Sequence, residues 1–573
     1  MIDKIYDNFK LPIEYCEKSE KIMKNLDQDL ELTQKNVGSE ISVYEKILNP
    51  TTKIGKQCIK PFSQNYTTDE SYLKDTQKLY ESIDTLKIDK ETIENTWECY
   101  TLIKNDNNFY DKYQYIEWDK FKWLNQISTF LFVFSLYNLS SPIINLFSPL
   151  FILIVPFIIL KIMRMPVTVD TYSKILLQQL KNHAIGKIFT QWNTVKSTQK
   201  VYLLFCAGLY VYNIYNNILS CMKFYRNTKN IGKTFDNMSN YLEQTIHNMD
   251  YYSNKISKLE SYNGFNITLK SYKEKLFHYK NKIDSLPKKK LSYKNILYLG
   301  NTMKEFYYIY NSSEFQDILQ YSFAFNGYLD VTNSIKKQIQ SKLLNKVKIL
   351  KKKKSTLKFK NFYNPLIEEK KAIKNNISLK KNKIITGPNA SGKTTLLKSC
   401  AINILLCQQV GFGYVESGKI TPFHYIHCYM NIPDTNGRDS LFQAEARRCL
   451  DILKHMDKHK YKRHFAVFDE LYSGTNPYEA ISSAYSYLKY ISKNTNVKFI
   501  LTTHYIKLCE LMKQDKNKTE NCNMETIINN DNPTYKYKIK KGISKIKGGV
   551  CVLKQLLYPE KIIKNTKNIL ETI

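Results

Sequence analysis

The sequence shows no sign of a disulfide framework and is short of acidic residues. Its 12 cysteines are scattered, with no Cys-x-x-Cys pair and no even spacing. This pattern argues against a disulfide-rich secreted domain and favours a reducing, intracellular setting. The opening residues, MIDKIYDNFK, lack an apolar run, so we expect no cleaved signal peptide. The 52 Asp and Glu residues face 86 Lys and Arg residues, a net charge of +34. Such an excess suits nucleic acid or anionic lipid, although a coding bias toward Lys and Asn would also raise it.

One long stretch has no charge of either sign. Residues 127–160 contain no charged side chain and most are large and apolar, which predicts insertion into a membrane. Ser140-Ser141-Pro142 divides the stretch into Trp123–Leu139 and Ile143–Leu160, so we expect a transmembrane hairpin over 123–160. A second uncharged run, Val201–Met222, contains three Asn residues, so we expect it to lie at the membrane interface or against protein.

The chain as a whole has the composition of a folded protein. Its 573 residues are 43% hydrophobic and 24% charged, enough for about three or four domains with sizeable cores.

A strand, a glycine-flanked loop and a helix start follow one another in Ile384–Lys398, IITGPNASGKTTLLK. Residues 387–394 fit the pattern G-x-x-x-x-G-K-[ST], in which backbone N–H groups and a helix N-terminus hold phosphate. We expect Lys393 to neutralise the β- and γ-phosphates of ATP and Thr394 to bind Mg²⁺. The residues expected to contact the nucleotide are Gly387, Pro388, Asn389, Ala390, Ser391, Gly392, Lys393, Thr394 and Thr395.

Two later apolar runs also end in polar side chains. Phe465–Phe468 leads into Asp469 and Glu470; we expect Asp469 to hold Mg²⁺ through its shell and Glu470 to polarise the attacking water. Ile500–Thr503 leads into His504, which is expected to hydrogen-bond the γ-phosphate or the water. Lys393, Glu470 and His504 are therefore the predicted catalytic residues.

From about Lys358 onward, short apolar runs alternate with helical patterns, which predicts a mainly parallel sheet covered by helices. The predicted strands are Lys383–Thr386, Tyr425–Asn431, His464–Phe468 and Lys498–Thr502. The predicted helices are Thr394–Cys407, Phe442–Met456 and Pro477–Ser492.

Two histidine pairs have spacings found in metal sites. They are His424 with His427, and His455 with His459. Because no second cluster of ligands accompanies them, we interpret these residues as ordinary members of a strand and a helix.

The motifs together resemble the ATPase domain of the MutS mismatch-repair family. TGPNASGKTT is followed by DELYSGTNPYEA and then TTHY, the order found in that family of ABC-type ATPases. GRDSLFQAE, at residues 437–445, resembles the family's signature loop. The resemblance implies a dimer with shared nucleotide sites, in which Ser440 reaches the partner's ATP, Glu445 supports the loop and residues 473–476 couple the sites. The C-terminal run is similar to the family's last strand and dimerisation helices.

The resemblance is weaker upstream of these motifs, and several features of the family are missing. NPTTKIGK, which begins at Asn49, is similar to the start of the MutS core and lever domain. About fifty residues precede it, so we expect no mismatch-reading domain, and no Phe-x-Glu reading motif stands there. Where the family often stacks an aromatic on adenine, this chain has Ala372-Ile373-Lys374-Asn375-Asn376. Membrane segments are not typical of the family either.

We therefore interpret the protein as a Mg²⁺-dependent, MutS-like ATPase, a homodimer or heterodimer, attached to a membrane and gripping DNA through its phosphates. The alternative is the nucleotide-binding subunit of a membrane transporter, but no LSGGQ-like signature and no set of six spans is present. A silent scaffold is disfavoured because the catalytic residues are all there.

Localisation follows from charge. Seven Lys and Arg residues between the apolar runs stand against Asp170 alone, so the positive-inside rule keeps this segment on the cytoplasmic side. We expect the ATP-binding half on the same side, because ATP is intracellular. A single crossing near 143–160 with a return at 201–222 ranks second, because it would export the basic segment. Without insertion, a nuclear or DNA-associated location is expected.

The expected fold is an α/β ABC-type P-loop ATPase joined to a mainly helical, lever-like region with an apolar insertion. The predicted segments are 1–122 (helical, lever-like), 123–222 (apolar insertion), 223–357 (helical arm), 358–530 (ATPase) and 531–573 (last strand and dimerisation helices).

Overall fold

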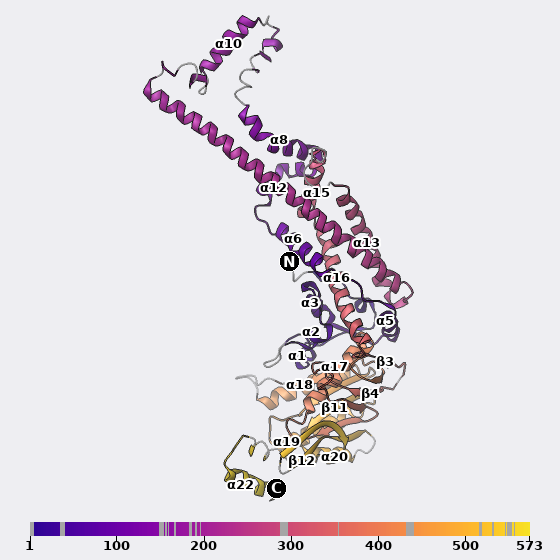
Figure 1. Cartoon of the computed structure of the whole chain (residues 1–573). Coiled ribbons are helices and arrows are strands. Elements are labelled where there is room, and N and C mark those ends of the chain that lie inside the picture. Colours follow the sequence, from indigo (N-terminus) through magenta and orange to yellow (C-terminus); the bar gives the residue numbers. More distant parts are fainter. Residues whose placement is uncertain are drawn as a thin grey trace. The chain divides into compact units, whose positions relative to one another are not determined.

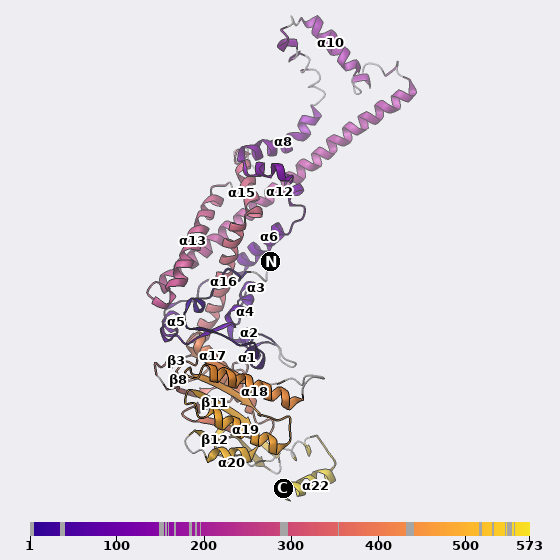
Figure 2. The same cartoon turned by 180° about the vertical axis from the view of Figure 1, so that it is seen from behind.

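The computed structural model describes most of the chain, in two compact units. The described residues are 5–34, 41–147, 154, 157–158, 160–164, 168–182, 186–188, 192–194, 196–286, 296–352, 354–430, 432, 440–514, 518–529, 532–544, 546, 550, 553–554 and 556–572. Unit 1 comprises Met1–Lys90, His247–Lys273 and Gln320–Ile573, and unit 2 comprises Glu91–Ile246 and Glu274–Leu319. Figure 1 labels their helices and strands, and Figure 2 shows them from behind.

A six-stranded sheet forms the centre of the C-terminal part of unit 1. Its order is β13-β12-β6-β11-β10-β9, and only β13 runs antiparallel to its neighbour. The strands are β6 (Asn382–Thr386), β9 (Tyr425–Tyr429), β10 (His464–Asp469), β11 (Val497–Thr503), β12 (Thr519–Asn529) and β13 (Asn532–Lys541). The predicted mainly parallel sheet is confirmed. Its register pairs Asp469 with Thr502 and Thr386 with Thr503, which gathers the carboxyl ends of three strands at one edge.

Helices cover both faces of this sheet. They are α17 (Lys393–Gln409), α18 (Leu441–Lys458), α19 (Pro477–Ile491) and α20 (Ile506–Lys513), and the three that were predicted are confirmed to within a few residues. Side chains of β10 alternate between the faces: Ala466 and Phe468 join a buried core with α18, α19 and α20. Phe465 and Val467, also fully buried, point to the opposite face, and α17 contacts β10 and β11.

A second, five-stranded sheet in unit 1 starts before the predicted ATPase boundary at residue 358. Its order is β5-β4-β8-β3-β7. The strands are β3 (Asn345–Ile349), β4 (Leu357–Phe362), β5 (Asn375–Ser378), β7 (Phe412–Gly413) and β8 (Ser417–Ile420).

The N-terminal ninety residues belong to the same unit. Their elements are η2 (Pro12–Tyr15), β1 (Ser19–Lys21), α1 (Lys24–Asp29), α2 (Val43–Leu48), α3 (Lys53–Gln57), α4 (Ile59–Phe62), β2 (Asn65–Thr67) and α5 (Glu70–Ser82). Buried glutamines of α17 fix them in place. The Nε2 of Gln409 donates to the carbonyls of Phe62 and Asn65, both at 3.0 Å, and its Oε1 accepts from the Tyr44 hydroxyl at 2.8 Å. The helix after the phosphate loop therefore shares a core with the N-terminal segment.

The segment resembling the start of the MutS lever, at residues 49–56, is held by one buried carboxylate. Asp330 of α16 (Ser313–Gln340) accepts four hydrogen bonds, from the backbone N–H and the hydroxyl of both Thr51 and Thr52, at 2.8–2.9 Å. A Cβ on Gly55 would lie 2.4 Å from its Oδ2, so glycine is required there.

Unit 2 is helical around an aromatic core. Its helices are α6 (Lys90–Lys104), α7 (Phe109–Tyr113), η3 (Asp119–Gln126), α8 (Ser128–Leu146), α10 (Val169–Asn182) and α15 (Leu299–Asn311), with parts of α12 (Ser197–Ile256) and α13 (Asn263–Asp284). Phe109 stacks on Tyr310 with ring centroids 3.7 Å apart and lies 5.6 Å from Phe306. The remaining elements, η4 (Glu260–Tyr262) and α22 (Glu560–Thr572), belong to unit 1.

The predicted break at Ser140-Ser141-Pro142 is wrong, because α8 continues through it. Proline normally interrupts a helix by leaving the carbonyl four residues earlier without a donor. Here that carbonyl is Asn138, and the Ser141 hydroxyl donates to it at 3.1 Å. Trp123 lies in η3, before α8 begins. The second arm of the predicted hairpin, 143–160, falls largely outside the described residues, and 201–222 is part of the 60-residue α12.

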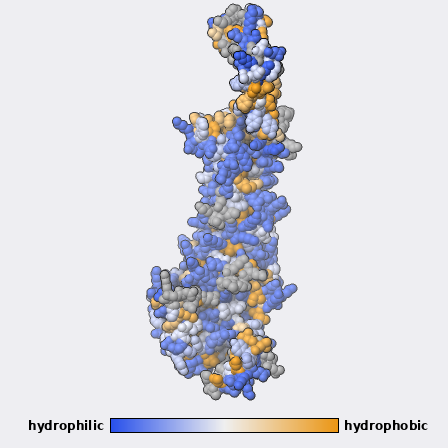
Figure 3. All heavy atoms as spheres, turned by 90° about the vertical axis from the view of Figure 1, so that its left-hand side faces the viewer, coloured by the Kyte–Doolittle hydropathy of each residue, from blue (hydrophilic) through white to orange (hydrophobic). Residues whose placement is uncertain are grey.

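Apolar side chains of α8 and the first part of α12 are exposed. In α8 they include Val133, Leu136 and Ile143; in α12 they include Val201, Phe205 and Val211. Figure 3 shows hydrophobic atoms at the level of α8 among largely hydrophilic ones. Of the helices in the described residues, α8 alone is long and apolar enough to cross a membrane, a test that core helices of soluble proteins also pass. One side of α8 packs on α15, where a Cβ on Gly300 would lie 2.1 Å from the Ser128 carbonyl.

Candidate active site

The loop between β6 and α17 has the backbone that a phosphate cradle requires. Gly392 has φ +89° and Ala390 φ +61°, both left-handed, and left-handed residues turn successive N–H groups toward one side. A Cβ on Gly387 would lie 2.7 Å from Ser391 Oγ, and one on Gly392 would lie 2.9 Å from the Tyr537 ring. The Ser391 hydroxyl is buried and has no hydrogen-bond partner. An unpaired donor in a glycine-lined loop fits a phosphate group.

Lys393 lies inside this loop. Its buried Nζ donates to the carbonyls of Gly387 at 3.1 Å and Pro388 at 3.3 Å. The same atom is 3.0 Å from Nε2 of His504 and 3.8 Å from Oε1 of Glu470. Burial lowers the pKa of the Lys393 ammonium, and the nearby carboxylates oppose that shift. The three predicted catalytic residues thus meet around one point.

The two predicted Mg²⁺ ligands are in direct contact. The Thr394 hydroxyl donates to Oδ2 of Asp469 at 2.7 Å, while the Thr502 hydroxyl donates to Oδ1. The second residue of α17 and the end of β10 are therefore joined through oxygen atoms, the ligand type that Mg²⁺ prefers.

Glu470 and His504 form the other half of the site. Oε1 of Glu470 lies 2.9 Å from Nε2 of His504. This hydrogen bond, with the charge of Lys393, holds the pKa of the Glu470 carboxyl below its usual value, although burial opposes the effect. Glu470 has a left-handed backbone, φ +53°, which is uncommon for a residue with a side chain. The conformation turns the carboxylate from the end of β10 toward the phosphate loop.

A cavity of about 550 Å³ adjoins the loop. Besides residues 389–396 it is lined by Tyr363, Ile373, Met524 and Tyr537, none of which the sequence had singled out as a ligand. Asn375 explains how Tyr537 reaches this place, since its amide donates to the Tyr537 carbonyl and accepts from the Ile539 N–H, both at 2.9 Å. Where we found no aromatic in 372–376, the fold supplies one from β13.

The predicted signature serine lies apart from this cavity. Ser440 is exposed and caps α18: its hydroxyl accepts from the Gln443 N–H at 3.3 Å. Residues 437–439 of the resembling loop lie outside the described residues. Glu445 is buried and accepts from the Ser473 N–H and hydroxyl and from the Gly474 N–H, at 2.8–3.1 Å. It therefore ties α18 to the 473–476 loop.

The similarity to known proteins lies in the same C-terminal part of the chain as this site. The family model described as MutS domain V matches residues 383–573. The chain is 30% identical over 220 residues to the DNA mismatch repair protein MutS of Persephonella marina, covering 37% of this chain and 25% of that protein. It is 29% identical over 259 residues to Endonuclease MutS2 of Lactobacillus helveticus, covering 43% and 32%. The chain thus spans between a quarter and a third of the length of these relatives, and the matches support membership of the MutS family.

Proposed function

We propose, from the similarity of the C-terminal third to MutS domain V, that this protein is an ATPase of the MutS type. It binds ATP and converts it with water to ADP and phosphate. The observation that carries the proposal is the convergence of Lys393, Glu470 and His504 beside the Thr394–Asp469 pair. Lys393 and Thr394 begin α17, Asp469 and Glu470 stand at the end of β10, and His504 follows β11. Together they supply a cation, a base and an oxygen-lined metal site.

The residues divide the chemistry between them. The loop N–H groups and the Ser391 hydroxyl bind phosphate oxygens, and the Lys393 ammonium neutralises their charge. Thr394 and Asp469 would hold Mg²⁺, which supplies further charge neutralisation on the phosphates. The pKa of Glu470 is held below its usual value, so its carboxyl group stays ionised at neutral pH. It can therefore accept a hydrogen bond from the attacking water and orient it. His504 positions that carboxylate.

For the base, we propose that adenine occupies the cavity beside Tyr537 and Tyr363. An aromatic side chain offers a flat apolar surface for a purine. Ile373 lines the same cavity and its side chain is 43% exposed. Contact with the base would bury this apolar side chain.

We further propose that the active form is a homodimer or MutS-like heterodimer in which Ser440 acts on the partner's nucleotide. Its exposed position at the start of α18 leaves the hydroxyl accessible to another chain.

Phosphate contacts with DNA are proposed from the net charge of +34 and from the names of the relatives. Membrane attachment is a separate proposal, supported by the exposed apolar residues of α8 and α12; retention in carbonate-washed membranes would support it and release would contradict it.

The decisive experiment for the ATPase is a comparison of Asp469→Asn with the wild-type protein at increasing Mg²⁺. An amide cannot hold the cation as a carboxylate does, so the variant should need at least about tenfold more Mg²⁺ for half-maximal hydrolysis, a loss of about 1.4 kcal/mol in binding. Asp451→Asn, an exposed residue of α18, is the control. Hydrolysis by wild type and variant with the same Mg²⁺ dependence would contradict the assignment. DNA binding is tested separately, as affinity that falls with rising salt.

A further inference from the structure

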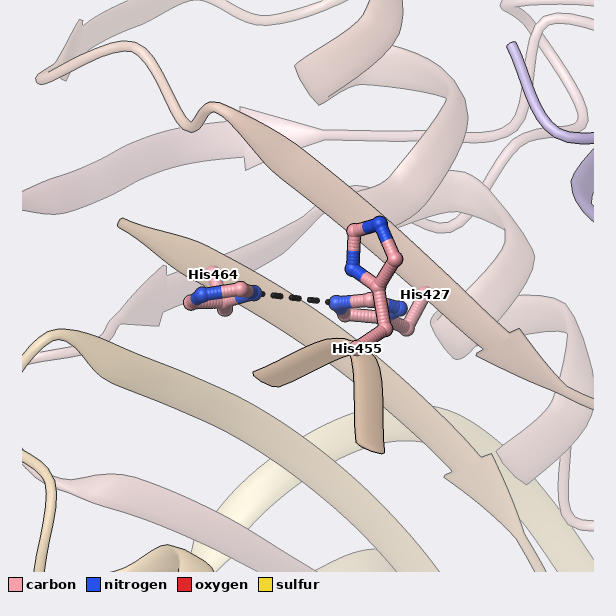
Figure 4. Close-up of side chains that lie close together, drawn as sticks. All are labelled: His427, His455 and His464. Atoms are coloured by element: carbon pink, nitrogen blue, oxygen red, sulfur yellow. Dashed lines mark hydrogen bonds between the residues drawn. The ribbon is translucent and has the colours of Figure 1, made fainter. Parts of the chain in front are cut away.

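Three histidines from three elements of unit 1 lie close together near the N-terminal ends of strands β9 and β10. His427 lies on β9, His464 is the first residue of β10, and His455 is on the last turns of α18 (Figure 4). One ring nitrogen of each lies within 4.8 Å of those of the others. Nε2 of His427 is 3.1 Å from Nδ1 of His464. The rings of this pair are inclined by 14°, and the His455 ring stands across them at 71° and 84°.

The protons of this group can be placed from its hydrogen bonds. Nε2 of His464 lies 3.0 Å from the His459 carbonyl, which can only accept, so this nitrogen carries the hydrogen. A neutral His464 then has a lone pair on Nδ1, directed at His427. Nδ1 of His455 is buried and has no hydrogen-bond partner. A buried ring nitrogen without a partner is unfavourable unless something else occupies its lone pair.

The surroundings keep the rings neutral. His427 and His464 are almost fully buried. This burial lowers the pKa of His464 to about 4 and lowers the pKa of His427 well below its usual value. Burial also lowers the pKa of His455. Arg448, a cation that acts on His427, is itself paired with Asp29 at 3.0 Å. Neutral imidazoles are the form that binds metals.

We propose that His427, His455 and His464 bind one transition-metal ion, with Zn²⁺ as the best fit. Imidazole nitrogens suit zinc, whereas Mg²⁺ and Ca²⁺ prefer oxygen. Zinc–nitrogen bonds of about 2.0–2.1 Å place tetrahedral ligand atoms about 3.3 Å apart, close to the 3.1 Å of the His427–His464 pair. His455 reaches the ion by turning its side chain, and water fills the fourth position.

The rest of the group already has the form of a metal site. The Nε2–H bond from His464 to the His459 carbonyl orients the ring, as a second hydrogen bond does for most metal-bound histidines. On binding, the proton of His427 moves from Nε2 to Nδ1, so the imidazole stays neutral and no proton is lost. The ion joins β9, β10 and α18. Asp469 is the last residue of β10, Glu470 follows it, and Ser440 is the N-cap of α18. Zinc therefore holds the opposite ends of the two elements that position these proposed ATPase residues.

Zinc content of the full-length chain tests the proposal. After chelator treatment, reloading with ZnCl₂ and dialysis, elemental analysis should find one zinc per chain in the wild type. His455→Ala removes one ligand from the least buried position and should weaken zinc binding at least tenfold. His278→Ala, an exposed histidine of α13, should bind like the wild type. A wild type without zinc, or equal affinity in His455→Ala, overturns the proposal.

X-ray absorption of the zinc-loaded wild type gives a second test that needs no variant. The expected first shell holds nitrogen and oxygen alone at about 2.0–2.1 Å, whereas a sulfur ligand would appear at about 2.3 Å. A sulfur shell would place the ion on cysteines and overturn the assignment even if one zinc per chain is found. Neither test uses ATP hydrolysis, so their outcome is independent of the proposed ATPase.

Discussion

Oε1 of Glu470 lies 2.9 Å from Nε2 of His504, at the ends of two neighbouring parallel strands. The hydrogen bond links the candidate base to His504, whose Nε2 also lies 3.0 Å from Nζ of the candidate phosphate-binding Lys393. Removal of the carboxylate charge should therefore affect hydrolysis more than binding, because Lys393 and the loop remain.

For Glu470→Gln we expect ATP turnover to fall by about 10²–10⁴-fold, the usual contribution of a general base. The affinity for ATP should change little, because the loop N–H groups and Lys393 are untouched. Steady-state phosphate release and equilibrium nucleotide binding measure the two effects separately. Glu510→Gln, an exposed residue of α20, is the matched control. Undiminished turnover in Glu470→Gln would contradict the assignment.

Tyr537→Ala should raise the KM for ATP and leave kcat nearly unchanged. The ring lies against Gly392 and lines the cavity, and an aromatic contact contributes about 0.5–1.5 kcal/mol, roughly 2- to 12-fold in KM. Because Tyr537 is 42% exposed, its loss should not unfold the domain. Tyr461→Ala, which removes a ring that is 92% exposed, should behave as wild type. An unchanged KM in Tyr537→Ala would show that the base binds elsewhere.

The free energy of unfolding should depend on pH through Asp29, at the contact between α1 and α18. Burial raises the pKa of Asp29 from 3.8 to about 6, even though Arg448 lies 3.0 Å away. A carboxyl with a raised folded pKa stabilises the fold most below pH 4. Its contribution then falls, by about 3 kcal/mol, as pH rises to 6.

Asp29→Asn cannot ionise, so the difference in free energy of unfolding between this variant and the wild type should move in favour of the variant from pH 4 to pH 7. Denaturant titrations at several pH values measure it. Asp7→Asn, an exposed residue, should show no such trend. A difference that stays constant with pH would show that Asp29 has an ordinary pKa.

Local patterns predicted the C-terminal sheet and its helices well. Apolar runs that end in a charged residue, such as Phe465–Phe468, form the central strands, because buried parallel strands need continuous apolar sequence. Contacts between distant segments could not be predicted from such patterns. Tyr363 and Tyr537 come together through pairing of distant strands, and His464 joins His427 and His455 although no short spacing connects them. The predicted break at Pro142 is wrong because the Ser141 hydroxyl replaces the N–H donor that proline lacks.

Asp330→Ala should destabilise unit 1 more than an average core substitution. It would leave the N–H group and hydroxyl of Thr52, which is buried, and those of Thr51, which is exposed, without the acceptor that all four share. Leaving buried donors unpaired costs about 1–3 kcal/mol for each group, so we expect the two donors of Thr52 alone to cost at least about 2 kcal/mol in the free energy of unfolding. Asp330→Asn retains one acceptor oxygen and should lose less. Asp451→Ala, on the exposed side of α18, serves as the control in the same denaturant titration. Equal losses in Asp330→Ala and Asp451→Ala would mean that the lever-like segment 49–56 is held by its apolar contacts and not by this carboxylate.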